Sequence, residues 1–210
     1  RGDLPTAAPF IGIAVVLDML DGRIARMTGT TSEFGVQLDS LADLISFGMA
    51  PAILAFQWGL VPLGRLGWAV GFLFVTAAAL RLARFNIQTH TDKRYFVGMP
   101  SPAAAAVPAA TVFYFPEGMH TFQQALPALA VVLVPALLMV STIRFRSFKS
   151  IDLGIKRSYR GLIAMAALIA AVASRPHEVL LLMAYAYLAS AFVGFAMSRL
   201  RAHRHATAPD

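Results

Sequence analysis

Residues 18–43 read DMLDGRIARMTGTTSEFGVQLDSLAD and contain four aspartates, Asp18, Asp21, Asp39 and Asp43. The first pair is three residues apart and the second pair is four apart, so in helices each pair would lie on one face. The turn MTGTTSEF between the pairs allows two antiparallel helices to bring all four carboxylates to one place. The stretch therefore predicts a helical hairpin with an acidic cluster.

The rest of the chain is strongly apolar. Of its 210 residues 58% are hydrophobic and 14% are charged, and the mean hydropathy is +0.65. Apolar runs of membrane-spanning length recur along nearly the whole sequence and leave no room for a separate soluble domain. We expect an all-α, polytopic integral membrane bundle that forms a single domain over 1–210. The absence of cysteine excludes disulfides, thiol nucleophiles and Cys-ligated zinc.

Breaks rich in Gly, Pro and charged residues divide the chain into seven expected helical spans. The fourth and sixth are short for a bilayer. Alanine-rich segments such as SPAAAAVPAA at 101–110 predict close helix packing. The spans are expected at about 6–27, 35–58, 67–88, 101–116, 125–142, 159–174 and 177–199.

The formal net charge is +7 and the pI is about 10.4. The basic residues lie between apolar spans, which indicates membrane topology and anionic lipid rather than a nucleic-acid partner. When the spans are threaded alternately through a membrane, one side keeps only Arg1, Arg65 and Arg175. We therefore expect the other side, and the aspartates with it, to face the cytoplasm from the cell (inner) membrane. That side carries Arg23, Arg26, Arg81, Arg84, Lys93, Arg94, Arg144, Arg146, Lys149, Lys156, Arg157, Arg160, Arg199, Arg201 and Arg204.

Four carboxylates at one helix end repel one another strongly in a low dielectric, so the cluster needs cations. Ligation by oxygen alone favours Mg²⁺ or Mn²⁺, with Ca²⁺ as a further option. Two divalent ions held by shared carboxylates commonly neutralise a diphosphate and stabilise its leaving oxygen. The aspartates are thus predicted to form a two-metal site.

Small residues flank the aspartates and leave room for a substrate against the helix backbone: Gly22 and Ala25 on the first helix and Gly35 on the second. Arg23 and Arg26 add positive charge where phosphates would lie. One alternative is that the acids only pair with these two arginines at the membrane interface. Another is a cation transporter, although such proteins usually place ionisable residues near the bilayer midplane, often within inverted repeats.

The spacing Asp18-x2-Asp21-Gly22-x2-Ala25-Arg26-x8-Gly35-x3-Asp39-x3-Asp43 resembles the complete signature of the CDP-alcohol phosphotransferases. Three further segments are similar to the bacterial phosphatidylserine synthase branch of that family. They are SLADLISFGMAPA at 40–52, RLARFN at 81–86 and GMPSPAAA at 98–105. The resemblance covers about the first half of the chain.

The resemblance implies transfer of the phosphatidyl group of CDP-diacylglycerol to L-serine, with release of CMP. The metals would bridge the diphosphate through Asp18, Asp21 and Asp39. Asp43 would lie near the second metal and act as the general base on the serine hydroxyl. The CDP site would be lined by Gly22, Ala25, Arg26 and Gly35.

The acceptor is less sharply indicated. Arg84 with Asn86 would hold the serine carboxylate and amine, whereas Arg81 and Arg84 would equally supply an anion pocket for glycerol 3-phosphate or inositol phosphate. The alternative for both arginines is that they only anchor the helix at the cytoplasmic interface, and we favour this alternative for Arg81. Ser101 is interpreted as a helix–helix hydrogen bond rather than a ligand.

The family resemblance also implies a homodimer and a further N-terminal span before the motif helix. A non-catalytic binder of CDP-lipid with the same fold is a third alternative, although the proposed base is present along with the metal ligands. Phe56, Trp58 and Trp68 are expected to form an aromatic belt at the outer interface.

Overall fold

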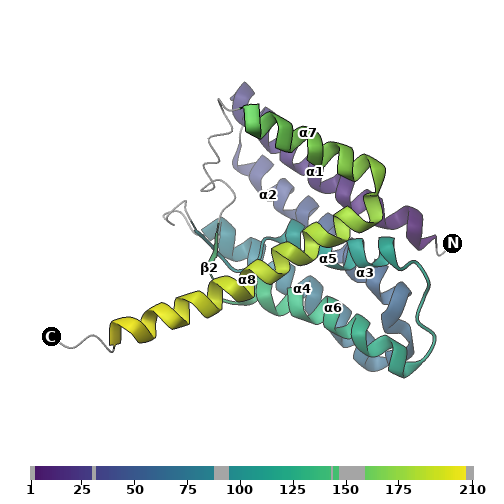
Figure 1. Ribbon diagram of the computed structural model, residues 1–210. Coiled ribbons are helices and arrows are strands. Elements are labelled where there is room, and N and C mark those ends of the chain that lie inside the picture. The colour runs from purple at the N-terminus through teal and green to yellow at the C-terminus, as the bar shows by residue number, and fades with distance from the viewer. Residues whose placement is uncertain (1–2, 30–31, 88–94, 143, 147–158, 207–210) are drawn as a thin grey trace.

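The computed structural model describes residues 3–29, 32–87, 95–142, 144–146 and 159–206. Within these ranges the chain is a bundle of helices with two short strands (Figure 1). The helices are α1 (Leu4–Thr28), α2 (Glu33–Asp43), η1 (Leu44–Met49), α3 (Ala50–Ala55), η2 (Phe56–Leu60), η3 (Val61–Leu63), α4 (Arg65–Ile87), α5 (Ser101–Tyr114), α6 (Phe122–Val140), α7 (Tyr159–Ser174) and α8 (Pro176–Ala206). The strands are β1 (Tyr95–Val97) and β2 (Arg144–Arg146).

Each of the seven expected spans corresponds to a helical stretch in the described residues. Boundaries differ by a few residues, except that α8 continues to Ala206 instead of ending near 199. Four stretches are long and apolar enough to cross a membrane: Leu4–Thr28, Glu33–Leu63, Arg65–Ile87 and Phe122–Val140. The integral membrane helical bundle predicted from the sequence is confirmed.

The fourth and sixth stretches are short, as expected. α5 has 14 residues and α7 has 16. At about 1.5 Å per residue they measure roughly 21 and 24 Å, less than the roughly 30 Å of a bilayer core. α5 is surrounded by other helices, so its length is set by packing in the bundle.

The hairpin that carries the aspartates has a defined end and a defined start. α1 ends at Gly29, whose φ of 67° lies in the left-handed region that favours glycine. α2 begins after Ser32, whose side-chain oxygen accepts a hydrogen bond from the backbone N–H of Gly35 at 3.0 Å. From Glu33 the chain stays helical to Leu63, with π-helical turns at η1 and η2.

The packed core centres on α5. It contacts α1, α3, α6 and α8, while α4 packs along α6 (Figure 1). Nine residues of α5 are buried, and most are small, as SPAAAAVPAA predicted. These are Ser101, Ala104, Ala105, Val107, Pro108, Ala109, Ala110, Thr111 and Val112.

A two-stranded antiparallel ladder joins the segment before α5 to the segment after α6. β1 pairs with β2 so that Phe96 lies opposite Phe145. Next to it, the Met99 N–H donates to the Leu138 carbonyl at 2.9 Å. Gly98 lies between, with a φ of 82° and with the Met139 carbonyl where a Cβ would be. The sequence analysis did not predict these strands, because three residues each are too few for a periodic signal.

The expected aromatic belt is wrong for one of its three members. Trp68 is 68% exposed, and its ring contacts that of Phe56 at an angle of 44°, as expected for two belt residues. Trp58 is only 2% exposed, and its indole Nε1 donates to the Phe115 carbonyl at 2.6 Å. It lies in the core because the π-helical η2 turns it toward the end of α5.

Candidate active site

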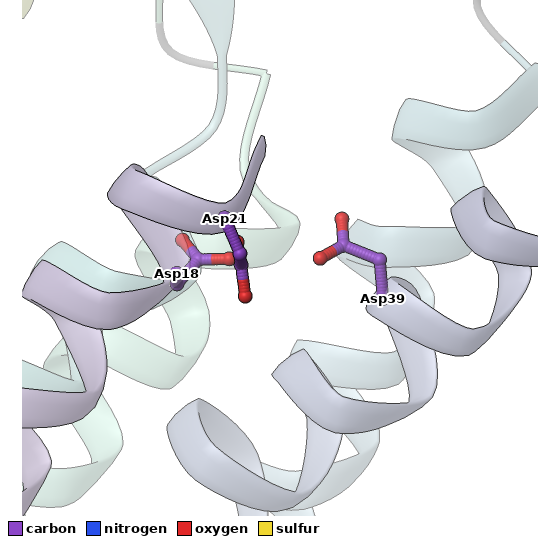
Figure 2. A group of neighbouring side chains, drawn as sticks. All are labelled: Asp18, Asp21 and Asp39. Carbon is purple, nitrogen blue, oxygen red and sulfur yellow. The ribbon is translucent and has the colours of Figure 1, made fainter. Parts of the chain in front are cut away.

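Three of the four aspartates meet between α1 and α2. Asp18 and Asp21 point from α1 toward Asp39 on α2 (Figure 2). One carboxylate oxygen from each lies within 4.8 Å of the others. Two oxygens on opposite sides of one Mg²⁺ lie about 4.2 Å apart, since each Mg–O bond is about 2.1 Å. The three carboxylates therefore fit around a hard divalent cation with little movement.

Asp43 lies one helical turn after Asp39 and is partly buried. Its carboxyl is within hydrogen-bonding reach of the carboxyl of Asp18. Two carboxylates in contact repel unless a proton or a cation lies between them. Asp43 thus joins the group of Asp18, Asp21 and Asp39 through its contact with Asp18. All four predicted aspartates therefore form one acidic cluster.

The π-helical turn η1 begins directly after Asp43. π-Turns inside α-helices are often found at functional sites, since the wider turn changes which way the neighbouring side chains face. Here the change occurs immediately beyond the last aspartate, so Asp39 and Asp43 keep α-helical spacing on one face. The following residues, including buried Phe47 and Gly48, then turn toward α4.

The interpretation of these acids as simple interface ion pairs is not supported. Among the described residues the ion pair within 4.0 Å is Arg175–Glu178, far along the chain. Arg26 is close enough to Asp39 to interact through its charge, but it forms no salt bridge with it in that set. The acids are therefore grouped with one another more closely than with Arg23 or Arg26.

The two glycines of the predicted CDP site have different local environments. A Cβ at Gly35 would lie 3.1 Å from the Ser32 hydroxyl oxygen, so glycine there protects the helix cap. A Cβ at Gly22 would meet only Arg26 Nη1, at an ordinary 3.7 Å. Glycine inside a helix costs about 1 kcal/mol relative to alanine. Neither packing among the described residues nor a positive φ requires glycine at position 22, which is compatible with the predicted role of Gly22 in leaving space beside the aspartates.

Ala25 and Arg26 complete the predicted nucleotide side of the cluster. Ala25 is half-buried on α1, and Arg26 is exposed one turn beyond Gly22. Both lie in the last two turns of α1, on the side of the aspartates toward the hairpin turn. The exposed guanidinium is free to reach a phosphate near Asp39.

The predicted serine-binding pair is only partly brought to the cluster. Asn86 Nδ2 donates to the Ser40 hydroxyl at 2.9 Å, which places Asn86 beside the residue that follows Asp39. Arg84 is half-buried in the same last turn of α4. Residues two apart on a helix face different directions, so Arg84 and Asn86 do not present one joint surface.

Arg81 lies closer to the aspartates than its sequence position predicted. It was interpreted as an interface anchor, yet its Nη1 donates to the Ser101 hydroxyl at 2.6 Å and its charge interacts with Asp43. This contact confirms Ser101 as a helix–helix hydrogen bond. A signal was present, because Arg81 lies six residues before the end of α4, deeper than an anchor in the last turn.

The sequence profile of the CDP-alcohol phosphatidyltransferase family matches residues 1–143, which include all four aspartates, Arg81 and Ser101. The chain belongs to this family. A CDP-diacylglycerol–serine O-phosphatidyltransferase of Helicobacter pylori (strain ATCC 700392 / 26695) is 44% identical over 149 residues. That match covers 68% of this chain and 61% of the relative.

Two further relatives are less similar to the chain. An archaetidylserine synthase of Methanothermobacter thermautotrophicus is 38% identical over 146 residues, covering 69% of this chain and 59% of the relative. An enzyme of Mycobacterium leprae with the same name as the Helicobacter protein is 41% identical over 105 residues, covering 47% of this chain and 35% of the relative. The chain thus aligns with about three fifths or less of each of these relatives' length.

The family assignment accounts for the acidic cluster. Phosphatidyltransferases of this family generally depend on divalent metal, and Asp18, Asp21 and Asp39 supply the oxygen ligands such ions prefer. α7 and α8 lie outside the residues that the family profile matches.

Proposed function

We propose that the protein transfers the phosphatidyl group of CDP-diacylglycerol to the hydroxyl of L-serine and releases CMP. The observation that carries the proposal is the acidic cluster, in which Asp18, Asp21 and Asp39 have oxygens within 4.8 Å of one another and Asp43 adjoins Asp18. Serine as the acceptor is supported by the names of two relatives, a CDP-diacylglycerol–serine O-phosphatidyltransferase and an archaetidylserine synthase.

In the proposed reaction the serine oxygen forms a bond to the phosphorus that carries diacylglycerol. The bond from that phosphorus to the CMP oxygen breaks, and CMP leaves with its electron pair. Asp43 takes the hydroxyl proton, which turns a poor nucleophile into a good one. Bound Mg²⁺ or Mn²⁺, with Ca²⁺ as a further option, would neutralise charge on the diphosphate and on the leaving CMP.

Different residues of the chain would bind different parts of the two substrates. Asp18, Asp21 and Asp39 would hold the cations, together with Asp43. Gly22, Ala25, Arg26 and Gly35 line the CDP side, where Arg26 pairs with phosphate oxygens. Asn86, next to Ser40, is the better placed of the two predicted serine contacts, and Arg84 would have to reach the serine carboxylate from a different face of α4.

The proposal includes the setting of the enzyme. We propose a homodimer in the cell (inner) membrane with the aspartates facing the cytoplasm, supported by the family resemblance and the distribution of basic residues. Several of these basic residues, Lys93, Arg94, Lys149, Lys156 and Arg157, lie outside the described residues. A single domain over 1–210 is supported by the packing of α8 on α5.

The test is CMP release by the purified full chain in detergent, with CDP-diacylglycerol and one acceptor at a time. The panel is L-serine, glycerol 3-phosphate and inositol phosphate, with Mg²⁺ and Mn²⁺ each supplied. We expect release with serine and background rates with the two phosphorylated acceptors. Release with another acceptor and none with serine would keep the family and overturn the acceptor. Tight binding of the lipid without turnover for any acceptor would favour a non-catalytic role.

A further inference from the structure

Arg81 stands where four helices of the bundle meet. Its guanidinium donates from Nη1 to Ser101 on α5, its charge interacts with Asp43 at the end of α2, and Tyr187 of α8 lies within its electrostatic reach. Its Nε is buried and has no hydrogen-bond partner among the described residues. An arginine that lies this deep in a membrane bundle is energetically costly and is seldom retained without a role.

Small residues explain how Arg81 reaches Asp43. A Cβ at Gly48 would lie 3.1 Å from the Cβ of Ala78, so η1 and α4 run in close contact at this height. Ala77 and Ala78 are both buried there. Gly48 follows Asp43 by five residues and Ala78 precedes Arg81 by three, and the two helices are antiparallel. The close approach therefore brings the two side chains within range of a charge interaction, although no ion pair within 4.0 Å joins them among the described residues.

Ser101 fixes the other side of the guanidinium. It is fully buried at the first residue of α5, and the start of α5 is tied to α6 by the Met99–Leu138 hydrogen bond. A guanidinium is a rigid planar fork, so when one nitrogen is held by Ser101 the direction of the others is largely set. The core of the bundle thereby defines where positive charge stands beside Asp43.

We propose that Arg81 is a positioning residue: its guanidinium, fixed by Ser101, attracts the Asp43 carboxylate by charge and so favours the orientation from which Asp43 takes the acceptor proton. The proposal rests on the proposed function, in which Asp43 is the base. Asp43 is then held between two neighbours, the carboxyl of Asp18 on the metal side and the guanidinium of Arg81 on the core side. Arg81 acts on Asp43 and does not need to contact the substrate.

The first experiment separates kcat from KM in Arg81→Met, Arg81→Lys and Ser101→Ala. A base displaced by about 1 Å loses about 100-fold in rate, so we expect kcat of Arg81→Met to fall by about that factor with KM for serine unchanged. Ser101→Ala removes one hydrogen bond and should lower kcat about 10-fold. Arg81→Lys keeps the charge without the fork and should fall between wild type and Arg81→Met.

The control is Thr111→Val, which removes another buried hydroxyl from α5. Thr111 bonds the Val107 carbonyl at 2.7 Å and the Tyr185 hydroxyl at 3.0 Å, and so joins α5 to α8 away from Asp43. We expect it to lower Tm and leave kcat unchanged. A raised KM for serine with kcat intact in Arg81→Lys would make Arg81 a substrate contact and overturn the proposal. Equal loss of kcat in Ser101→Ala and Thr111→Val would overturn it as well.

A second measurement does not depend on turnover. In a double-mutant cycle with Arg81→Met and Asp43→Asn, the loss of Tm caused by Arg81→Met should shrink by at least about 2 °C when Asp43 is already neutral. Additive losses of Tm would show that the two side chains do not interact and would overturn the proposal. If the wild type releases CMP only with a different acceptor, the acceptor assignment fails separately, and the same kcat comparison with that acceptor tests Arg81.

Discussion

α2 and α5 are both in the matched part of the chain, yet they are built in opposite ways. None of the eleven residues of α2, all of them described, is buried, whereas nine of the fourteen residues of α5 are. α2 carries Asp39 and Asp43 at the edge of the bundle, and α5 supplies its packed centre. The metal-binding side chains and most of the packing side chains therefore lie on different helices, so most core substitutions should change stability more than activity, with Ser101 as the exception because it bonds Arg81.

Removal of metal should give the largest effect, and it should act on the acidic cluster of α1 and α2 rather than on the core around α5. We expect excess EDTA to bring CMP release to background and Mg²⁺ or Mn²⁺ to restore it, because four carboxylates cannot hold a diphosphate without cations. Added Mn²⁺ should also raise Tm of the wild type by binding the folded state, and this rise should be much smaller in Asp39→Asn. Full activity in EDTA would contradict the two-metal proposal.

Asp43→Asn should separate activity from folding most cleanly. The amide has nearly the same shape but cannot take a proton, so we expect kcat to fall by about 10²- to 10⁴-fold. Tm should change little, because the relief of repulsion from Asp18 offsets the lost attraction to Arg81. Single-turnover CMP release and a melting curve on the same preparation check both. Retention of a substantial fraction of the rate would remove Asp43 from the role of base.

Gly67→Ala should lower stability and leave activity unchanged. A Cβ at Gly67 would collide with the carbonyl oxygen and carbon of Leu60, where α4 starts against the end of the preceding helix. We expect a loss of about 1–3 kcal/mol in stability, seen as a lower Tm, with kcat of the folded fraction preserved. Gly71→Ala is the matched control on the same helix, since nothing lies within 4 Å of its Cβ position. Equal Tm values for the two variants would refute the steric argument.

Gly22→Ala should give the smallest effect and the most specific one. The helix gains up to about 1 kcal/mol from the better helix former, and the added methyl meets only Arg26. We expect Tm to stay or rise while KM for CDP-diacylglycerol increases and KM for serine does not. The matched variant Gly35→Ala should raise the same KM but, unlike Gly22→Ala, should also lower Tm, because the added methyl crowds the Ser32 cap. Unchanged KM for the lipid in Gly22→Ala would remove Gly22 from the nucleotide side.

Local patterns were enough to predict the helices and the cluster. Apolar runs located the helical stretches, and the three- and four-residue spacings placed Asp18 and Asp21 on one face and Asp39 and Asp43 on another. These predictions succeed because they depend on the helix period and on one hairpin. Membership of the family was also predictable, since the signature occupies 26 consecutive positions from Asp18 to Asp43.

Contacts between distant parts of the chain were not predictable. Arg81 has the same basic character as the anchors around it, and only its neighbours Asp43 and Ser101, 38 and 20 residues away, distinguish it. Trp58 looked like a belt residue until η2 turned it toward Phe115. In each case the deciding partner comes from another helix, and no periodicity within one helix identifies it.

The ladder between β1 and β2 has a consequence for recombining relatives. The family-wide part of the chain ends at residue 143, and β2 begins at Arg144, so the first segment beyond it pairs directly back onto Tyr95–Val97. A chimera that exchanges the C-terminal helices at this boundary would pair β1 from one parent with β2 from the other. Chimeras joined here should therefore take residues 95–97 from the same parent as the C-terminal part, so that both strands of the ladder come from one protein.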